Sequence, residues 1–140
     1  MGIEKYFHDG PGYCPFIIRE GWQVAQLNHV ANHGLNDILD VERHNLTDEV
    51  FVLVSGKAVL LSASFDAGQP DIEYVAMELG VTYNVPAGVW HNIAMSRDCQ
   101  VMITEKDRTH VNDCEYRAFT NEQLQEIYRQ IARIVDFSFI

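Results

Sequence analysis

The sequence predicts an all-β protein, an antiparallel double-stranded jelly-roll barrel built from two sheets, with a C-terminal α-helix. About nine short segments rich in β-branched and apolar residues are separated by turns of Gly, Pro and Asn, as in antiparallel sandwiches and barrels. The last segment has apolar residues at the helical spacings of 3, 4 and 7: Leu124, Ile127, Tyr128, Ile131, Ile134 and Val135. These two periodicities predict the fold class, but they do not separate one kind of sandwich from another.

The length and composition predict a single globular domain. The 140 residues are enough for one hydrophobic core, and the apolar fraction of 47% with 21% charged residues is ordinary for a globular protein. We expect one domain over residues 1–140, with an N-terminal arm over 1–15, the barrel over about 16–105 and the helix over about 121–135. Thr120 and Gln123 have the spacing of a capping box at the start of that helix.

Charge and cysteine usage narrow the class of partner. The formal net charge of −10 argues against a nucleic acid or an anionic membrane, since both require clustered Lys and Arg. No apolar run approaches the length of a membrane span. Cys14, Cys99 and Cys114 match no zinc or redox spacing, so we expect reduced thiols in a cytoplasmic protein.

The stretch Gly80–Met95 carries the most specific signal. Two short strands flank the turn Pro86-Ala87-Gly88, in which proline fixes one φ and glycine can adopt a positive φ. His91 leaves this turn on an apolar strand and shares a face with Ile93. An imidazole in that position is either a hydrogen-bonded core histidine or a ligand.

The spacing of Gly80, Pro86, Gly88 and His91 resembles the second sequence motif of the cupin superfamily. Met95 stands where that motif ends in Asn, which is a departure from the pattern. The residues of this chain alone leave both interpretations of His91 open, and the resemblance favours the ligand.

The first cupin motif is matched in part by the segment before Gly56. Glu49 lies seven positions before this glycine, and His44 lies five positions before Glu49. Glu42 occupies the place of the first motif histidine, so the expected H-x-H reads E-R-H. Because strand side chains alternate, Glu42 and His44 share a face and Arg43 points away from it.

The resemblance implies that four side chains converge inside the barrel: Glu42, His44, Glu49 and His91. Two imidazoles and two carboxylates form a mixed nitrogen and oxygen ligand set for Mn, Fe, Ni or Zn. The alternative without a metal has Glu42 paired with a neighbouring cation, His44 at the surface, and Glu49 facing His91.

Two classes of function remain open. The resemblance implies a cupin that binds or converts a small polar metabolite, such as a sugar or sugar derivative, in an isomerase- or epimerase-like reaction. His91 or His44 would then move the proton between adjacent carbons. The alternative is a non-catalytic small-molecule binding or sensing cupin without metal, since one fold hosts many functions.

The remaining features predict assembly more than chemistry. The segment Glu49–Val54 is apolar on both faces after its first residue, and with the helix stripe and the apolar tail (Phe137, Phe139, Ile140) it predicts a homodimer. His29 and His33 lie in a loop near the barrel mouth and could reach a ligand, although we expect both to be solvated. We expect 106–116 to be irregular. The sequence assigns no role to His110.

Overall fold

A computed structural model describes the backbone of residues 2–138 and the side chains of residues 2–135. Its ten strands form two five-stranded sheets in which every pair of neighbouring strands is antiparallel. The first sheet, in spatial order, consists of β1 (Gly12–Arg19), β2 (Trp22–Asn28), β9 (Gln100–Glu105), β4 (Glu49–Ser55) and β7 (Thr82–Val85). The second consists of β10 (Glu115–Ala118), β3 (Asp40–Arg43), β8 (Trp90–Met95), β5 (Ala58–Ser64) and β6 (Asp71–Ala76). The predicted two-sheet jelly roll is confirmed.

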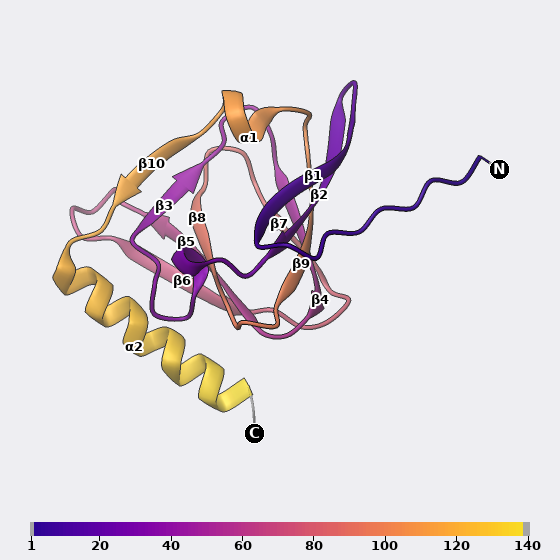
Figure 1. Ribbon diagram of the computed structural model, residues 1–140. Helices are drawn as coiled ribbons and strands as arrows, with labels where there is room; N and C mark the ends of the chain where they lie inside the picture. The colour runs from indigo at the N-terminus through magenta and orange to yellow at the C-terminus, as the bar shows by residue number, and fades with distance from the viewer. Residues whose placement is uncertain (1, 139–140) are drawn as a thin grey trace.

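Two apolar clusters hold the layers together. The first fills the space between the sheets, where Phe51 and Val101 of the first sheet pack in one cluster with Leu60 and Ile93 of the second. The second cluster lies between the outer face of the second sheet and the C-terminal helix α2 (Asn121–Ser138) (Figure 1). Burying a side chain such as Ile127 contributes roughly 1.5–3 kcal/mol to folding. The helix therefore closes one side of the sandwich.

Helix α2 begins where the sequence predicts it. The backbone N–H of Thr120 donates to Oε1 of Gln123 at 2.8 Å, and the N–H of Gln123 donates to the Thr120 hydroxyl at 3.2 Å. This reciprocal pair is a capping box, which satisfies two backbone donors at the helix start. The predicted stripe is also confirmed, because Leu124, Ile127 and Ile131 are buried against the sheet.

The sequence predicts an irregular segment over 106–116, and this prediction is wrong. The segment contains the helical turn α1 (Thr109–Asn112) and leads into β10, which pairs with β3 at the edge of the second sheet. All four residues of β10 are exposed, so no alternation of apolar and polar residues marks it as a strand. Its structure comes from pairing with a strand about 75 positions earlier, which local sequence does not encode.

The ends and the first long loop complete the chain. Residues 2–11 form an extended arm that leads away from the barrel before β1 (Figure 1). A single 3-10 turn, η1 (Ala31–His33), lies in the loop between β2 and β3. Within residues 2–138, no helix has the length and apolar character needed to cross a membrane. Phe139 and Ile140 lie outside the described residues, and the side chain of Phe137 lies outside the described side chains.

Gly56 of the first motif provides a test of the fold. Its φ is +73°, and a Cβ added there would lie 2.6 Å from the backbone Cα of Cys99. We expect Gly56→Ala to destabilise the protein by more than about 3 kcal/mol, because a positive φ costs roughly 1–2 kcal/mol and the backbone clash adds to it. Urea denaturation followed by circular dichroism measures the change in the free energy of unfolding.

Gly68→Ala is the matched control. Gly68 also has a positive φ, +88°, but nothing lies within 4 Å of an added Cβ. This variant should therefore lose only the stability that the positive φ costs, without a clash. Equal losses of stability in the two variants would contradict the proposed close approach of the two backbones at Gly56.

Candidate functional site

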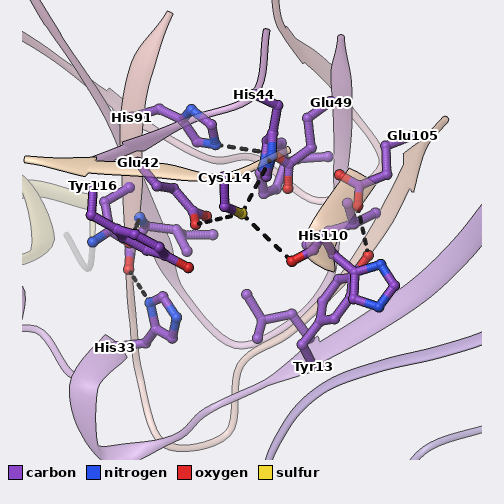
Figure 2. A pocket seen from close by; sticks show the side chains of 15 residues that line it. Tyr13, His33, Glu42, His44, Glu49, His91, Glu105, His110, Cys114 and Tyr116 are labelled. Atoms are coloured by element: carbon purple, nitrogen blue, oxygen red, sulfur yellow. Dashed lines mark hydrogen bonds and ion pairs between the residues drawn. The ribbon is translucent and has the colours of Figure 1, made fainter. Parts of the chain in front are cut away.

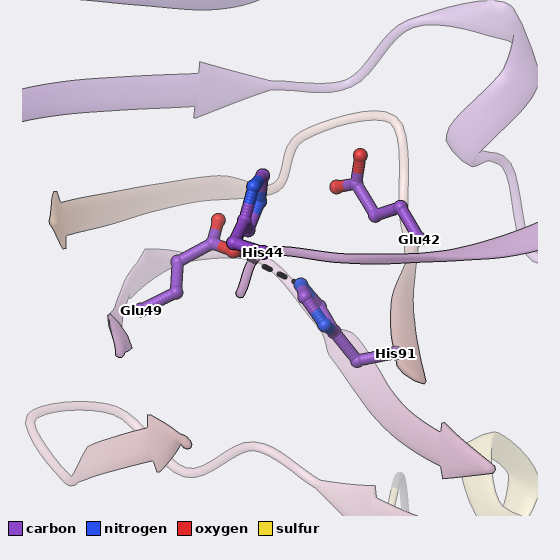
Figure 3. A group of neighbouring side chains, drawn as sticks. All are labelled: Glu42, His44, Glu49 and His91. Atoms are coloured by element: carbon purple, nitrogen blue, oxygen red, sulfur yellow. Dashed lines mark hydrogen bonds and ion pairs between the residues drawn. The ribbon is translucent and has the colours of Figure 1, made fainter. Parts of the chain in front are cut away.

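The four residues of the predicted ligand set come together at one end of the barrel. Glu42 lies on β3 opposite His91 of β8, His44 follows β3, and Glu49 is the first residue of β4. One potential ligand atom from each side chain lies within 4.8 Å of the others (Figure 3). His44, Glu49 and His91 are buried, and Glu42 is half-buried. Strands of both sheets therefore contribute to the cluster.

The two imidazole rings are held in one orientation by backbone carbonyls. Nδ1 of His44 lies 2.5 Å from the carbonyl oxygen of Asp113, and Nδ1 of His91 lies 2.9 Å from that of Val89. A carbonyl oxygen only accepts hydrogen bonds, so each Nδ1 carries a hydrogen. Each Nε2 then faces the same atom, Oε2 of Glu49, at 3.0 Å from His44 and 2.9 Å from His91.

This arrangement shifts the pKa of each of the four side chains in the cluster. Burial lowers the pKa of both histidines, but the hydrogen bond and charge of Glu49 outweigh it, raising the pKa of His44 to about 9 and that of His91 in the same direction. Burial would raise the pKa of Glu49, yet its bonds to the two histidines lower it overall. Glu42 has a raised pKa because it is buried and lies near the Glu49 carboxylate.

The donor set fits a divalent metal ion. With both Nδ1 atoms protonated, each Nε2 can face a carboxylate oxygen favourably only if it carries a proton or if a cation lies between them. Carbonyl acceptors on Nδ1 are the usual means of orienting metal-binding histidines. The ligand types suit Mn, Fe, Ni or Zn. The interpretation that placed His44 at the surface is wrong, since His44 is only 4% exposed.

The cluster forms one wall of a cavity of about 210 Å³ (Figure 2). Apolar side chains from both sheets line another part of it: Leu27, Phe51, Ile93 and Ile103. A second polar group faces the cavity from outside the cupin motifs: Tyr13, His33, Glu105, His110, Cys114 and Tyr116. Of these residues, the sequence analysis named only His33, His110 and Cys114, and it assigned none of them to the site.

Glu105 is the most buried member of the second group. It is 5% exposed and lies directly opposite Glu49 in the pairing of β9 with β4. Its Oε1 accepts hydrogen bonds from the Tyr13 hydroxyl at 3.0 Å and from Nε2 of Gln23 at 3.1 Å. Burial, followed by the negative charge of Glu49, raises the pKa of Glu105 to about 7. A charged residue at the end of an apolar strand was the only sequence signal for it.

Two other histidines are placed by the structure. Nδ1 of His33 lies 3.1 Å from the carbonyl oxygen of Ile93, and His33 lines the cavity. The expectation that His33 is a solvated loop residue is therefore wrong, because the turn η1 directs it inward. Nδ1 of His110 lies 2.9 Å from Nε2 of Gln23, and His110 also lines the cavity.

Comparisons with known proteins agree on the fold. No family model and no curated protein matches the sequence. Pac13 from Streptomyces, a β-barrel nucleoside dehydratase, is 14% identical over 77% of this chain and 78% of its own, with a TM-score of 0.56. A Pac13 variant solved with uridine is 15% identical over 88% of this chain and 97% of its own, with a TM-score of 0.59.

A cupin-2 domain protein from Shewanella frigidimarina is 22% identical over 71% of this chain and 84% of its own, with a TM-score of 0.47. The likeness to Pac13, at these low identities, concerns the fold alone. The sheet topology and this likeness together define a two-sheet β-barrel. The chain is an antiparallel two-sheet jelly-roll barrel with a C-terminal helix, as the sequence predicted.

Asp113 offers a test of how the site is held. Its carboxylate accepts the backbone N–H groups of Asn45 at 2.9 Å and Leu46 at 2.7 Å, directly after His44. Asp113→Ala should lower the free energy of unfolding by about 1–3 kcal/mol, since two backbone donors lose a charged acceptor. Asp113→Asn, which keeps one acceptor oxygen, should fall between wild type and Ala in thermal denaturation. Equal stability of all three proteins would contradict this role.

Proposed function

We propose that this protein binds a divalent transition metal through Glu42, His44, Glu49 and His91, and uses the site to bind or convert a small polar metabolite. The convergence of two Nε2 atoms on one carboxylate oxygen carries the proposal. A metal ion would satisfy both nitrogens and offset the repulsion between Glu42 and Glu49, which lie in the same cluster. When bound, it would supply a Lewis acid that polarises an oxygen of the ligand.

The cavity supports a small ligand. Its volume of about 210 Å³ lies below the roughly 300–1,000 Å³ of pockets for drug-sized molecules. Polar groups at two walls and apolar side chains between them are the usual composition of a specific metabolite pocket. Variants of Pac13 were solved with uridine, which is consistent with a sugar or sugar derivative as the ligand class here.

The second candidate is an isomerase- or epimerase-like reaction without metal. It is favoured by the raised pKa of His44, about 9, which makes this imidazole a proton donor at neutral pH. His91 would exchange the second proton with the substrate. The two candidates exclude each other at one atom: because Nδ1 is already bonded to a carbonyl, the same Nε2 cannot both hold a metal and carry the proton.

Metal titration distinguishes the two candidates. Saturating Mn(II), Ni(II) or Zn(II), or Fe(II) without oxygen, should raise the melting temperature by about 5–10 °C, because a ligand at 100 times its Kd adds about 2.7 kcal/mol to stability. A chelator should reverse the rise. Differential scanning fluorimetry and elemental analysis of the purified protein measure both effects.

Single variants then assign the ligands. Glu49→Gln and His91→Ala should abolish the metal-dependent rise, and Glu42→Gln should reduce it, since Glu42 is the least buried of the four. His29→Ala, a histidine outside the residues that line the cavity, should leave the rise intact. A wild-type protein that binds no metal and does not respond to these ions would favour the candidate without metal.

We also propose a homodimer in the cytoplasm. Half-buried Val24, Val50, Val52 and Met102 lie on the outer face of the first sheet. The first sheet lies on the side of the barrel opposite α2 (Figure 1). In the arm, Ile3 is 97% exposed and Phe7 is 73% exposed. A second copy of the chain would cover this apolar surface. The cysteines are free, which supports a reducing compartment.

Light scattering tests the dimer. Wild type should have twice the 16.0 kDa chain mass at micromolar concentration. Val52→Glu should give a monomer, because a carboxylate at the centre of the interface would be buried without a partner. Val111→Glu, at a valine that is 67% exposed on α1, should remain dimeric. A wild-type mass of one chain would refute the proposal.

A further inference from the structure

The Glu105 carboxylate has an acceptor that the protein leaves unused. Oε1 receives hydrogen bonds from Tyr13 and Gln23, whereas Oε2 is buried without a partner among the described residues. A buried polar atom without a hydrogen bond costs about 1–3 kcal/mol, so such atoms are rare in folded proteins. Glu105 lines the same cavity as the four-residue cluster, from the neighbouring strand.

The neighbours of Glu105 determine which of its two carboxylate oxygens has a hydrogen-bond partner. Gln23 is fully buried, and its amide contacts Tyr13 and His110 as well as Glu105. The oxygen of the same amide accepts the backbone N–H of Arg108 at 2.7 Å. These contacts hold Oε1 on the protein side. Oε2 is thus the carboxylate oxygen that these contacts leave without a partner, in a residue that lines the cavity.

The charge of the cavity wall restricts what that group can be. Among the described residues, no lysine or arginine lines the cavity, whereas three carboxylates do: Glu42, Glu49 and Glu105. A phosphate or carboxylate group placed beside Glu105, away from the four-residue cluster, would face this acid with no lysine or arginine to pair with. A hydroxyl group suits Oε2 in either protonation state of Glu105, because it both donates and accepts hydrogen bonds.

We propose that Glu105 anchors a neutral, hydroxyl-bearing ligand, an unphosphorylated sugar or nucleoside, by accepting a hydrogen bond from one of its hydroxyl groups at Oε2. Another oxygen of the same ligand faces the metal cluster, so this inference rests on the proposed function. The apolar side chains of Phe51 and Ile103, which line the same cavity, contact the less polar face of the sugar ring. The strand β9 thus carries a specificity residue that lies outside both sequence motifs.

The first test is independent of the ligand. Glu105→Gln keeps an oxygen for Tyr13 and Gln23, replaces the unpartnered Oε2 with an uncharged amide nitrogen, and removes one of two neighbouring negative charges. We expect it to raise the melting temperature of the ligand-free protein by a few degrees. Gln23→Ala, which removes a hydrogen-bond partner without removing the carboxylate, should lower it. If Glu105→Gln lowers the melting temperature as much as Gln23→Ala, Glu105 is a structural residue and the proposal is wrong.

The second test uses two matched pairs of probes with the Mn(II)-loaded protein: D-ribose with D-ribose 5-phosphate, and uridine with uridine 5′-monophosphate. Calorimetry should show that a neutral member binds at least about 10-fold more tightly than its phosphorylated partner. Glu105→Gln should weaken the neutral probe by about 10-fold or more, because hydrogen bonds to charged groups are the stronger class. Equal or tighter binding of the phosphorylated probes, or no binding of either neutral probe, overturns the proposal.

A separate readout keeps this proposal apart from the metal site. The Mn(II)-dependent rise in melting temperature should be the same in Glu105→Gln as in wild type, since Glu105 lies outside the four-residue cluster. If Mn(II) does not raise the melting temperature of the wild-type protein, the proposed metal site is wrong. A normal rise together with unchanged probe binding in Glu105→Gln would refute the role of Glu105 alone.

Discussion

One atom, Oε2 of Glu49, is the point on which the site depends. His44 and His91 both direct Nε2 at it, and the three side chains come from different segments of the chain. Glu49 begins a strand of the first sheet, whereas His91 lies within a strand of the second. Their contact requires the two sheets to be packed at a fixed distance, so the apolar core between them is what positions the polar cluster. Removing the Glu49 carboxylate would leave two buried imidazoles without their shared acceptor, which is costly in a water-poor interior.

The glycines of the two motifs could be predicted because a turn that needs a positive φ is a local feature. Gly56 has a φ of +73° after β4, and Gly88 has a φ of +84° in the turn that leads to His91. The start of α2 could be predicted for the same reason, since a capping box involves residues three positions apart. Each of these constraints is written into a few consecutive positions and needs no knowledge of the rest of the fold.

The other half of the site could not be predicted because its residues meet only through tertiary pairing. Asp113 supports His44 across about 70 positions, and Glu105 meets Tyr13 across 92. No spacing within the sequence relates these residues, and β10 lacks the alternation that reveals a strand. His33 shows the opposite problem, because its loop looked solvated while the turn η1 directs it to the carbonyl of Ile93. The motifs therefore identify the side of the cavity that carries Glu42, His44, Glu49 and His91, and the fold supplies the side proposed to select the ligand.

The two halves are linked by the register of β4 and β9, which places Glu49 beside Glu105. Two buried carboxylates on neighbouring strands repel each other, and the two are treated differently by their partners. Glu49 is neutralised by two histidines, which lower its pKa, whereas burial and the charge of Glu49 raise the pKa of Glu105 to about 7. A sequence selected only for stability would replace one of them with an apolar residue, since buried charges rarely add net stability. The presence of a second acid in this position, with one oxygen unsatisfied, is therefore better explained by a ligand than by the fold.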